Sequence, residues 1–207
     1  MKSILVLSVK GGVGKSTAAV NLAVASIAAG QVAGVVDVDP QASATAWARV
    51  RTAKTPLVVT VGSDDLHKAL GEARQMGYAS VWVDSAGANT SDLTEDVREV
   101  DFALVPILPS PADVLTAFVS ADLAKAAGTP FAFVLNSVPA RSPEAASARE
   151  VLARLGPVCA AELGDRLAFR RAFGAGLGVV ESDPGSPADV EVRALFTEVW
   201  SLANGKA

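Results

Sequence analysis

The sequence predicts a doubly wound α/β fold, in which a mostly parallel sheet is covered by helices on both faces. Short runs rich in β-branched residues alternate along the chain with segments of helical spacing. Half of the 207 residues are hydrophobic and 19% are charged, as expected for a sheet that is buried on both sides. The length suits one domain with a sizeable core, so we expect residues 1–207 to form a single unit.

Seven apolar runs are expected as strands of this sheet. In chain order they span residues 4–9, 32–39, 57–61, 79–85, 102–107, 131–138 and 157–163. Residues 16–36 contain no charged residue, yet Gly30 and Gln31 interrupt them, so a buried helix followed by a buried strand explains this stretch better than a membrane span. From Pro187 to Ala203 apolar residues repeat at helical spacing, which predicts a final helix packed against the sheet.

Cysteine content, the N-terminal sequence and net charge argue against a secreted, disulfide-bonded protein and against a chain that is basic overall. The only cysteine, Cys159, cannot form an internal disulfide, so we expect a small buried residue in a cytoplasmic protein. The N-terminal apolar run leads into a glycine-rich loop without a cleavage-site pattern, which indicates a strand rather than a signal peptide. A formal net charge of −4 argues against a chain that is basic overall but leaves room for a local basic patch.

Residues 9–17, VKGGVGKST, predict a phosphate-binding turn between the first strand and a helix that begins near Lys15. Glycines let the backbone turn tightly so that several N–H groups point at phosphate oxygens, and the helix N-terminus adds partial positive charge. Lys15 is expected to reach the β- and γ-phosphates, and the Ser16 hydroxyl to ligate Mg²⁺. The expected nucleotide-binding residues of this loop are Gly11, Gly12, Val13, Gly14, Lys15, Ser16 and Thr17.

Carboxylates at the ends of two other predicted strands complete a magnesium–phosphate site. Asp84 ends the apolar run SVWV, the Walker B arrangement, in which a carboxylate holds Mg²⁺ directly or through its water. Asp37 and Asp39 end the second predicted strand in DVDPQ and would lie near the loop if that strand neighbours the first. An aspartate at a strand end is often only a turn former, but three carboxylates around one predicted site favour function.

Four motifs in order, KGGVGKST, DVDPQASATAW, VWVDSAG and PILPSPAD, resemble the deviant Walker A ATPases of the ParA/MinD family. The chain is most similar to the small plasmid-partition ParA proteins typified by ParF. The resemblance implies a slow, Mg²⁺-dependent ATPase that forms a homodimer around ATP, and it gives the second lysine of the loop a role. Lys10 would reach across the dimer to the partner's phosphates, and Val9, which replaces the first glycine of the usual pattern, is then no defect.

The resemblance also implies roles for four further residues. Asp39 would position or activate the hydrolytic water, and Asp37 would join Ser16 and Asp84 in the Mg²⁺ network. Gly87 would sense the γ-phosphate through its backbone. Asn136, at the end of FVLN, is a candidate adenine contact, with a turn asparagine as the alternative.

The arginines that follow residue 138 suggest a surface for nonspecific DNA, which ParA-type dimers bind through basic residues in this region. We expect Arg166, Arg170 and Arg171 to contact DNA phosphates, with ordinary solvated arginines as the alternative. Lys10 comes nine residues after the start, so no helix-turn-helix extension and no operator binding are expected.

The resulting hypothesis is a cytoplasmic, nucleoid-associated ATPase that is discharged by a cargo-linked, ParB-like adaptor and segregates a plasmid or chromosome. Positioning of a protein assembly, such as a carboxysome or a chemotaxis cluster, is the alternative. A MinD-type membrane ATPase is less favoured, because the chain ends in EVWSLANGKA rather than in a basic amphipathic helix. A nitrogenase-iron-protein-like reductase would need more thiolates than Cys159 supplies.

Overall fold

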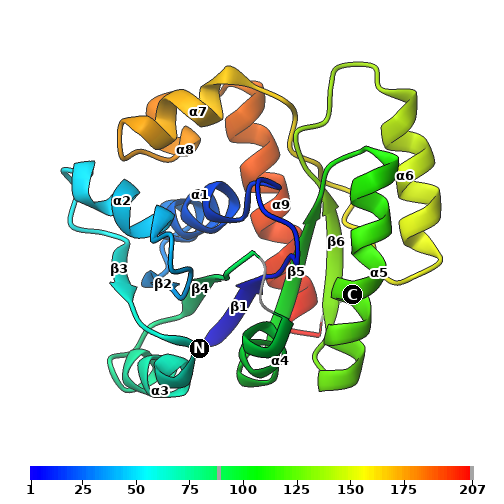
Figure 1. Ribbon diagram of the computed structural model, residues 1–207. Coiled ribbons are helices and arrows are strands. Elements are labelled where there is room, and N and C mark those ends of the chain that lie inside the picture. Colours follow the sequence, from blue (N-terminus) through cyan, green and yellow to red (C-terminus); the bar gives the residue numbers. More distant parts are fainter. Residues whose placement is uncertain (88–89, 206–207) are drawn as a thin grey trace.

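The computed structural model describes residues 1–87 and 90–205, and in it six parallel strands form one sheet (Figure 1). The strand order is β3-β2-β4-β1-β5-β6, so the doubly wound α/β fold predicted from the sequence is confirmed. The strands are β1 (Lys2–Val6), β2 (Ala33–Asp37), β3 (Leu57–Thr60), β4 (Ser80–Asp84), β5 (Phe102–Ile107) and β6 (Phe131–Leu135).

The expected seventh strand, residues 157–163, does not form, so the expected strand count was one too high. This segment runs beside β6 but bridges it only at Val158, opposite Phe133, and just past its end, where Gly164 bridges Val138. Between the two bridges, the amides of Ala160 and Ala161 donate to the Glu198 carboxylate at 2.7 and 3.0 Å instead of joining a ladder. An acceptor on a later helix therefore replaces the strand partner that the apolar pattern predicts.

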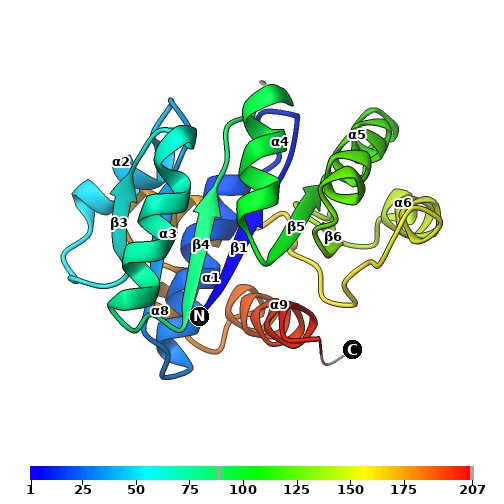
Figure 2. The same cartoon turned by 90° about the horizontal axis from the view of Figure 1, so that it is seen from below.

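Helices cover both faces of the sheet (Figure 2). Within the described residues, one layer holds α1 (Lys15–Ala28), α2 (Ser43–Val50), α7 (Leu167–Gly174), α8 (Val179–Ser182) and α9 (Pro187–Ala203). The opposite layer holds the 3₁₀ turn η1 (Ser63–Asp65), α3 (Leu66–Gln75), α4 (Thr90–Glu99), α5 (Pro111–Ala127) and α6 (Pro143–Ala153). The expected final helix is α9, with its bounds as predicted.

Alternation along the strands divides the core in two. In β4, Trp82 packs with the α1 and α9 layer, whereas Val81 and Val83 pack with α3, α4 and α5. Cys159 is completely buried in the first of these clusters, as expected, and burial raises the pKa of its thiol to about 12. No helix among residues 1–87 and 90–205 has the length and apolar character needed to cross a bilayer, which agrees with reading residues 16–36 as the buried α1 and β2.

Arg51, at the C-terminal end of α2, connects that helix to the turn between α7 and α8. Its guanidinium pairs with both carboxylate oxygens of Glu181, at 2.6 and 2.8 Å, and donates to the Gly176 carbonyl at 2.8 Å. The same group lies 4.9 Å from the ring centre of Trp47, whose indole N–H donates to the Leu177 carbonyl. The Arg51 side chain is only 3% exposed, and these buried contacts join α2 to the turn that follows α7 and to α8.

Candidate nucleotide site

The loop between β1 and α1 has the conformation that the glycine pattern predicts. Gly12 and Gly14 have φ angles of 79° and 90°, in the left-handed region that favours glycine. A methyl group on Gly14 would also overlap the side-chain nitrogen of Asn136. Gly14 is the N-cap of α1, so the first N–H groups of a 14-residue helix face the space beyond the carboxyl ends of the strands.

Lys15 reaches back over this loop. Its ammonium donates to the Lys10 carbonyl at 3.2 Å, and Gly87 lies so close that a methyl group there would come within 3.1 Å of the Lys15 nitrogen. Burial lowers the pKa of Lys15, and the charges of Asp84 and Asp39 oppose that shift. The structure therefore places Gly87 against the phosphate loop, and its contact with a γ-phosphate stays a prediction.

Asp84 is the least satisfied side chain of the site. It ends β4, with Val6 of β1 and Asp37 of β2 as its register neighbours. Neither carboxylate oxygen accepts a hydrogen bond of normal geometry from the described residues. Burial raises the pKa of Asp84 to about 7; the nearby Ser16 hydroxyl and Lys15 oppose the shift, and Asp37 and Asp39 add to it. A buried carboxylate without a partner beside a serine hydroxyl fits a cation or its water.

Asp37 is already engaged within the protein. It is completely buried, and its carboxylate accepts hydrogen bonds from the Thr45 amide and hydroxyl, both at 2.8 Å, and from the Asp39 amide at 3.2 Å. Asp39 in turn accepts from the Gln41 amide at 2.9 Å and lines the pocket described below. Asp37 therefore holds the start of α2, while Asp39 is the aspartate that faces the pocket.

No three His, Cys, Asp or Glu side chains of the described residues gather as a ready metal site. Of the predicted Mg²⁺ ligands, Ser16 lies beside Asp84, whose carboxylate oxygens accept no hydrogen bond of normal geometry from the described residues, whereas Asp37 accepts three hydrogen bonds, from Asp39 and Thr45. A cation held here would need the Ser16 hydroxyl and phosphate oxygens in addition to carboxylates, which is how phosphate-loop proteins bind Mg²⁺.

A pocket of about 390 Å³ lies above the loop. It brings together most of the residues predicted for nucleotide binding, and it adds three that sequence reasoning did not assign: Gln41, Ser43 and Phe173. Gln41 and Ser43 belong to the DVDPQASATAW string, so the motif itself could have identified them. Phe173 lies on α7, far along the chain, where no sequence signal pointed to the nucleotide. The lining residues are Gly11, Gly12, Gly14, Lys15, Ser16, Thr17, Asp39, Gln41, Ser43, Gly87 and Phe173.

Asn136 lies against the phosphate loop rather than among the residues that line this pocket. It is buried, and its side-chain amide donates to the Val13 carbonyl at 2.6 Å. This hydrogen bond connects the end of β6 to the phosphate loop. The contact of Asn136 with adenine remains a prediction.

Lys10 is held by its own subunit and does not line the pocket. Its ammonium lies 2.6 Å from a carboxylate oxygen of Asp113, which is 5% exposed, whereas the Lys10 side chain is 40% exposed. Asp113 sits in the first turn of α5, and the hydroxyl of the N-cap residue Ser110 donates to its other oxygen. The SPAD element of the sequence thus supplies the partner of the second lysine, a pairing that sequence reasoning did not foresee.

The three arginines predicted to contact DNA are not equivalent. Arg166 forms a bidentate pair with Glu191 of α9, with bonds of 2.5 to 3.0 Å, and this hydrogen bonding raises its pKa. Arg170 is 69% exposed and has only a 3.4 Å contact to Asp165. Arg171 is exposed and forms no ion pair among the described residues. Arg170 and Arg171 are therefore available to a ligand, whereas Arg166 is committed to α9.

Comparison with known proteins agrees with this site. Residues 4–178 match the family described as the CobQ/CobB/MinD/ParA nucleotide binding domain. A protein of Gloeobacter kilaueensis named "Maintenance of carboxysome distribution protein A" is 34% identical over 183 residues, which cover 86% of this chain and 83% of that protein. Its namesake from Halothiobacillus neapolitanus is 27% identical over 209 residues, 95% of each chain.

Among solved structures, the septum site-determining protein MinD of Pyrococcus horikoshii, complexed with Mg-ADP, superposes with a TM-score of 0.83. The match covers all of this chain and 98% of MinD, at 20% identity, and so it shows the fold. The resemblance drawn from the sequence is thereby confirmed: this chain belongs to the CobQ/CobB/MinD/ParA family and has its nucleotide-binding ATPase fold.

Proposed function

We propose that this protein is a Mg²⁺-dependent ATPase that dimerises on ATP, binds DNA without sequence preference and positions a protein assembly in the cytoplasm. The observation that carries the choice of cargo is that both curated relatives bear a name for carboxysome distribution. They favour protein-assembly positioning, the alternative of the sequence hypothesis, over plasmid partition. A carboxysome or a similar large protein body is the proposed cargo.

The proposed chemistry uses the pocket residues in the following way. Loop N–H groups and Lys15 bind and orient the phosphates, and Asp39 holds the attacking water. Mg²⁺, when bound, would offset negative charge on the β- and γ-phosphates, and Ser16 and Asp84 would hold it, with Asp37 fixing the loop behind them. The buried, unpartnered oxygens of Asp84 support this assignment.

The pairing of Lys10 with Asp113 supports a switch. In this structure Lys10 pairs with Asp113 of its own subunit. We propose that Lys10 leaves Asp113 when it contacts the phosphates of a partner subunit. ATP therefore competes with Asp113 for Lys10 from across the dimer, and hydrolysis returns the lysine to Asp113. The charge that completes the transition state would then be present only in the dimer, so an isolated subunit would turn over slowly.

DNA binding is assigned to Arg170 and Arg171 on α7. Both are exposed, and a dimer doubles their number, which multiplies salt-sensitive phosphate contacts. Arg166 is a weaker candidate, because Glu191 would have to release it. We further propose nucleoid association and a cargo-linked adaptor that stimulates hydrolysis, as the resemblance implies.

The biochemical test measures anisotropy of a random-sequence labelled duplex with ATP–Mg²⁺, with ADP and without nucleotide, across a salt series. We expect binding with ATP alone, weakening steeply as salt rises, and lost in Arg170→Glu/Arg171→Glu. The exposed pair Arg74→Glu/Arg98→Glu, away from α7, is the matched control and should bind as the wild type does. Equal binding in all three nucleotide states would overturn the DNA switch.

The cargo is tested by deletion of the gene in its own host. We expect the protein assemblies to cluster while plasmid retention is unchanged. Plasmid loss with normally spaced assemblies would reject the proposed cargo in favour of partition.

A further inference from the structure

The two edges of the sheet differ in how they are covered. Along β6, the segment that contains Pro157, Cys159 and Leu163 supplies backbone hydrogen bonds of 2.8 to 3.0 Å. At the other edge, β3 pairs with β2 and with no other strand of the described residues. An open edge presents unpaired N–H and C=O groups, to which another extended strand can add.

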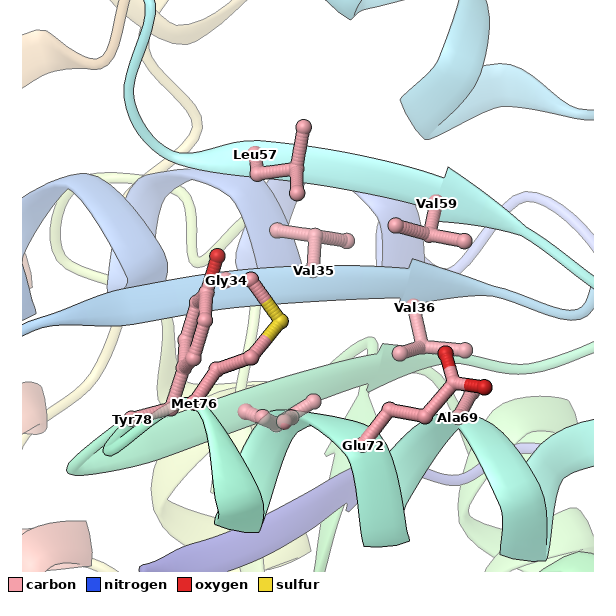
Figure 3. Close-up of a pocket in the computed structure, with 11 residues that line it drawn as sticks. Gly34, Val35, Val36, Leu57, Val59, Ala69, Glu72, Met76 and Tyr78 are labelled. Atoms are coloured by element: carbon pink, nitrogen blue, oxygen red, sulfur yellow. The ribbon is translucent and has the colours of Figure 1, made fainter.

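The open edge is also apolar. Leu57 and Val59 are on the side of β3 that faces the α3 layer, since their register partners in β2 are Gly34 and Val36. Yet α3 does not cover them: Leu57 is 48% exposed, Val59 40%, and Met76 at the end of α3 68%. Figure 3 shows these side chains around a cavity of about 70 Å³ between β2, β3 and α3, with Glu72 as its only charged lining residue. A group of exposed apolar side chains beside an open edge marks a contact surface.

Charges at the two ends of β3 indicate what kind of partner fits. Lys54 precedes the strand, and Asp64 and Asp65 follow it in η1; all three are exposed. None of them forms an ion pair among the described residues. An antiparallel neighbour of identical sequence would bring its Asp64 end to Lys54 and its Lys54 end to Asp64, whereas a parallel copy would oppose like charges.

We propose that β3 is a self-association edge, at which two copies of this chain pair their β3 strands antiparallel about a two-fold axis near Val59. The two sheets then continue into each other, the Leu57 and Val59 side chains of both copies cover one another, and Lys54 meets Asp64 at each end. Because β3 has four residues, few hydrogen bonds form, and the association is weak and concentration-dependent. Neither Leu57 nor Val59 lines the pocket above the phosphate loop, so the contact does not need nucleotide.

The test is sedimentation equilibrium of the full chain without nucleotide, from micromolar to near-millimolar concentration. Lys10→Ala is the background, so that ATP-driven dimers of the proposed function cannot contribute. We expect a monomer–dimer equilibrium that Val59→Lys weakens at least tenfold, since it places two ammonium groups at the two-fold axis. Val190→Lys, at an exposed apolar position of α9, is the control and should dimerise as the background does.

A charge exchange distinguishes this pairing from general stickiness. Lys54→Glu and Asp64→Lys should each weaken the dimer, and the double variant should recover part of the loss. A chain that stays monomeric at every concentration, equal effects of Val59→Lys and Val190→Lys, or losses that simply add would each overturn the proposal. Circular dichroism confirms that the variants are folded, and Leu57→Ser replaces Val59→Lys if that variant is not.

Discussion

Asp84→Asn tests whether the buried charge of Asp84 destabilises the folded protein in the absence of a bound cation. The pKa of Asp84 lies near 7, against an ordinary value of 3.8, so the group loses more by ionising in the folded protein than in the unfolded chain. About three pKa units correspond to about 4 kcal/mol of lost stability once both states are ionised, above pH 7. An amide lacks this charge but stays poorly hydrogen-bonded, at a cost of about 1–3 kcal/mol. We therefore expect Asp84→Asn to stabilise the protein by about 1–3 kcal/mol at pH 8.

The sign of the pH dependence follows from the same shift. Because the folded-state pKa is raised, the wild type is most stable with Asp84 protonated, below about pH 4, and loses that stability as the pH rises to 7. Between pH 8 and pH 5 the wild type should therefore gain about 2–3 kcal/mol relative to Asp84→Asn, which removes or reverses the advantage of the variant. The assay is urea unfolding at pH 8 and pH 5 in EDTA without nucleotide, with the exposed Asp122→Asn as control. An Asp84→Asn variant no more stable than the wild type at pH 8, or an advantage independent of pH, would refute this reasoning.

Five further predictions concern the nucleotide site and the second lysine. Lys15→Ala removes the ammonium over the loop, so isothermal titration should show loss of ATP affinity; unchanged affinity would reject the phosphate site. Asp39→Ala should bind ATP and dimerise but not release phosphate, and wild-type turnover would dismiss its role. Lys10→Ala should bind ATP but form no dimers, as measured by light scattering. Asp113→Asn removes the ion pair that holds Lys10 in each subunit, in which the lysine is 40% exposed; at about 1–2 kcal/mol per dimer, this should tighten dimerisation about 5–30-fold. Gly14→Ala should lower the free energy of unfolding, measured with urea, by about 1–3 kcal/mol, because φ is 90° at this position and Asn136 leaves no space for a methyl group. Gly11→Ala is the control and should leave stability unchanged, because no atom lies within 4 Å of the added methyl group.

The sequence predicts the sheet and the turn of the glycine loop, because both depend on local signals. Apolar runs between turn residues define strands, and the glycines before Lys15 define the loop, whereas the interest of Gly87 came only from the family resemblance. The segment 157–163 defeats the same reasoning, since its composition suits a strand but Glu198, contributed by a distant helix, takes its amides. Local propensity does not report such a tertiary acceptor.

Side-chain partners were the part that the sequence could not supply. Arg166 and Arg170 look alike in GDRLAFRR, and only packing against α9 pairs the first with Glu191. Lys10 and Asp113 are far apart in the chain, and they meet because β1 and β5 are parallel neighbours, so that the segments that follow these strands begin at the same end of the sheet. Phe173 lines the pocket because α7, which is far along the chain, packs beside α2.

The contacts of Arg51 and Trp47 connect two helices that border the pocket. Ser43 at the start of α2 and Phe173 on α7 touch the same pocket, while Arg51 and Trp47 fasten the opposite end of α2 to the turn that leaves α7. Arg170 and Arg171 lie on the same helix as Phe173. A ligand that displaced Phe173 or Ser43 would therefore act on the helix that carries these two positive charges, although neither arginine lines the pocket.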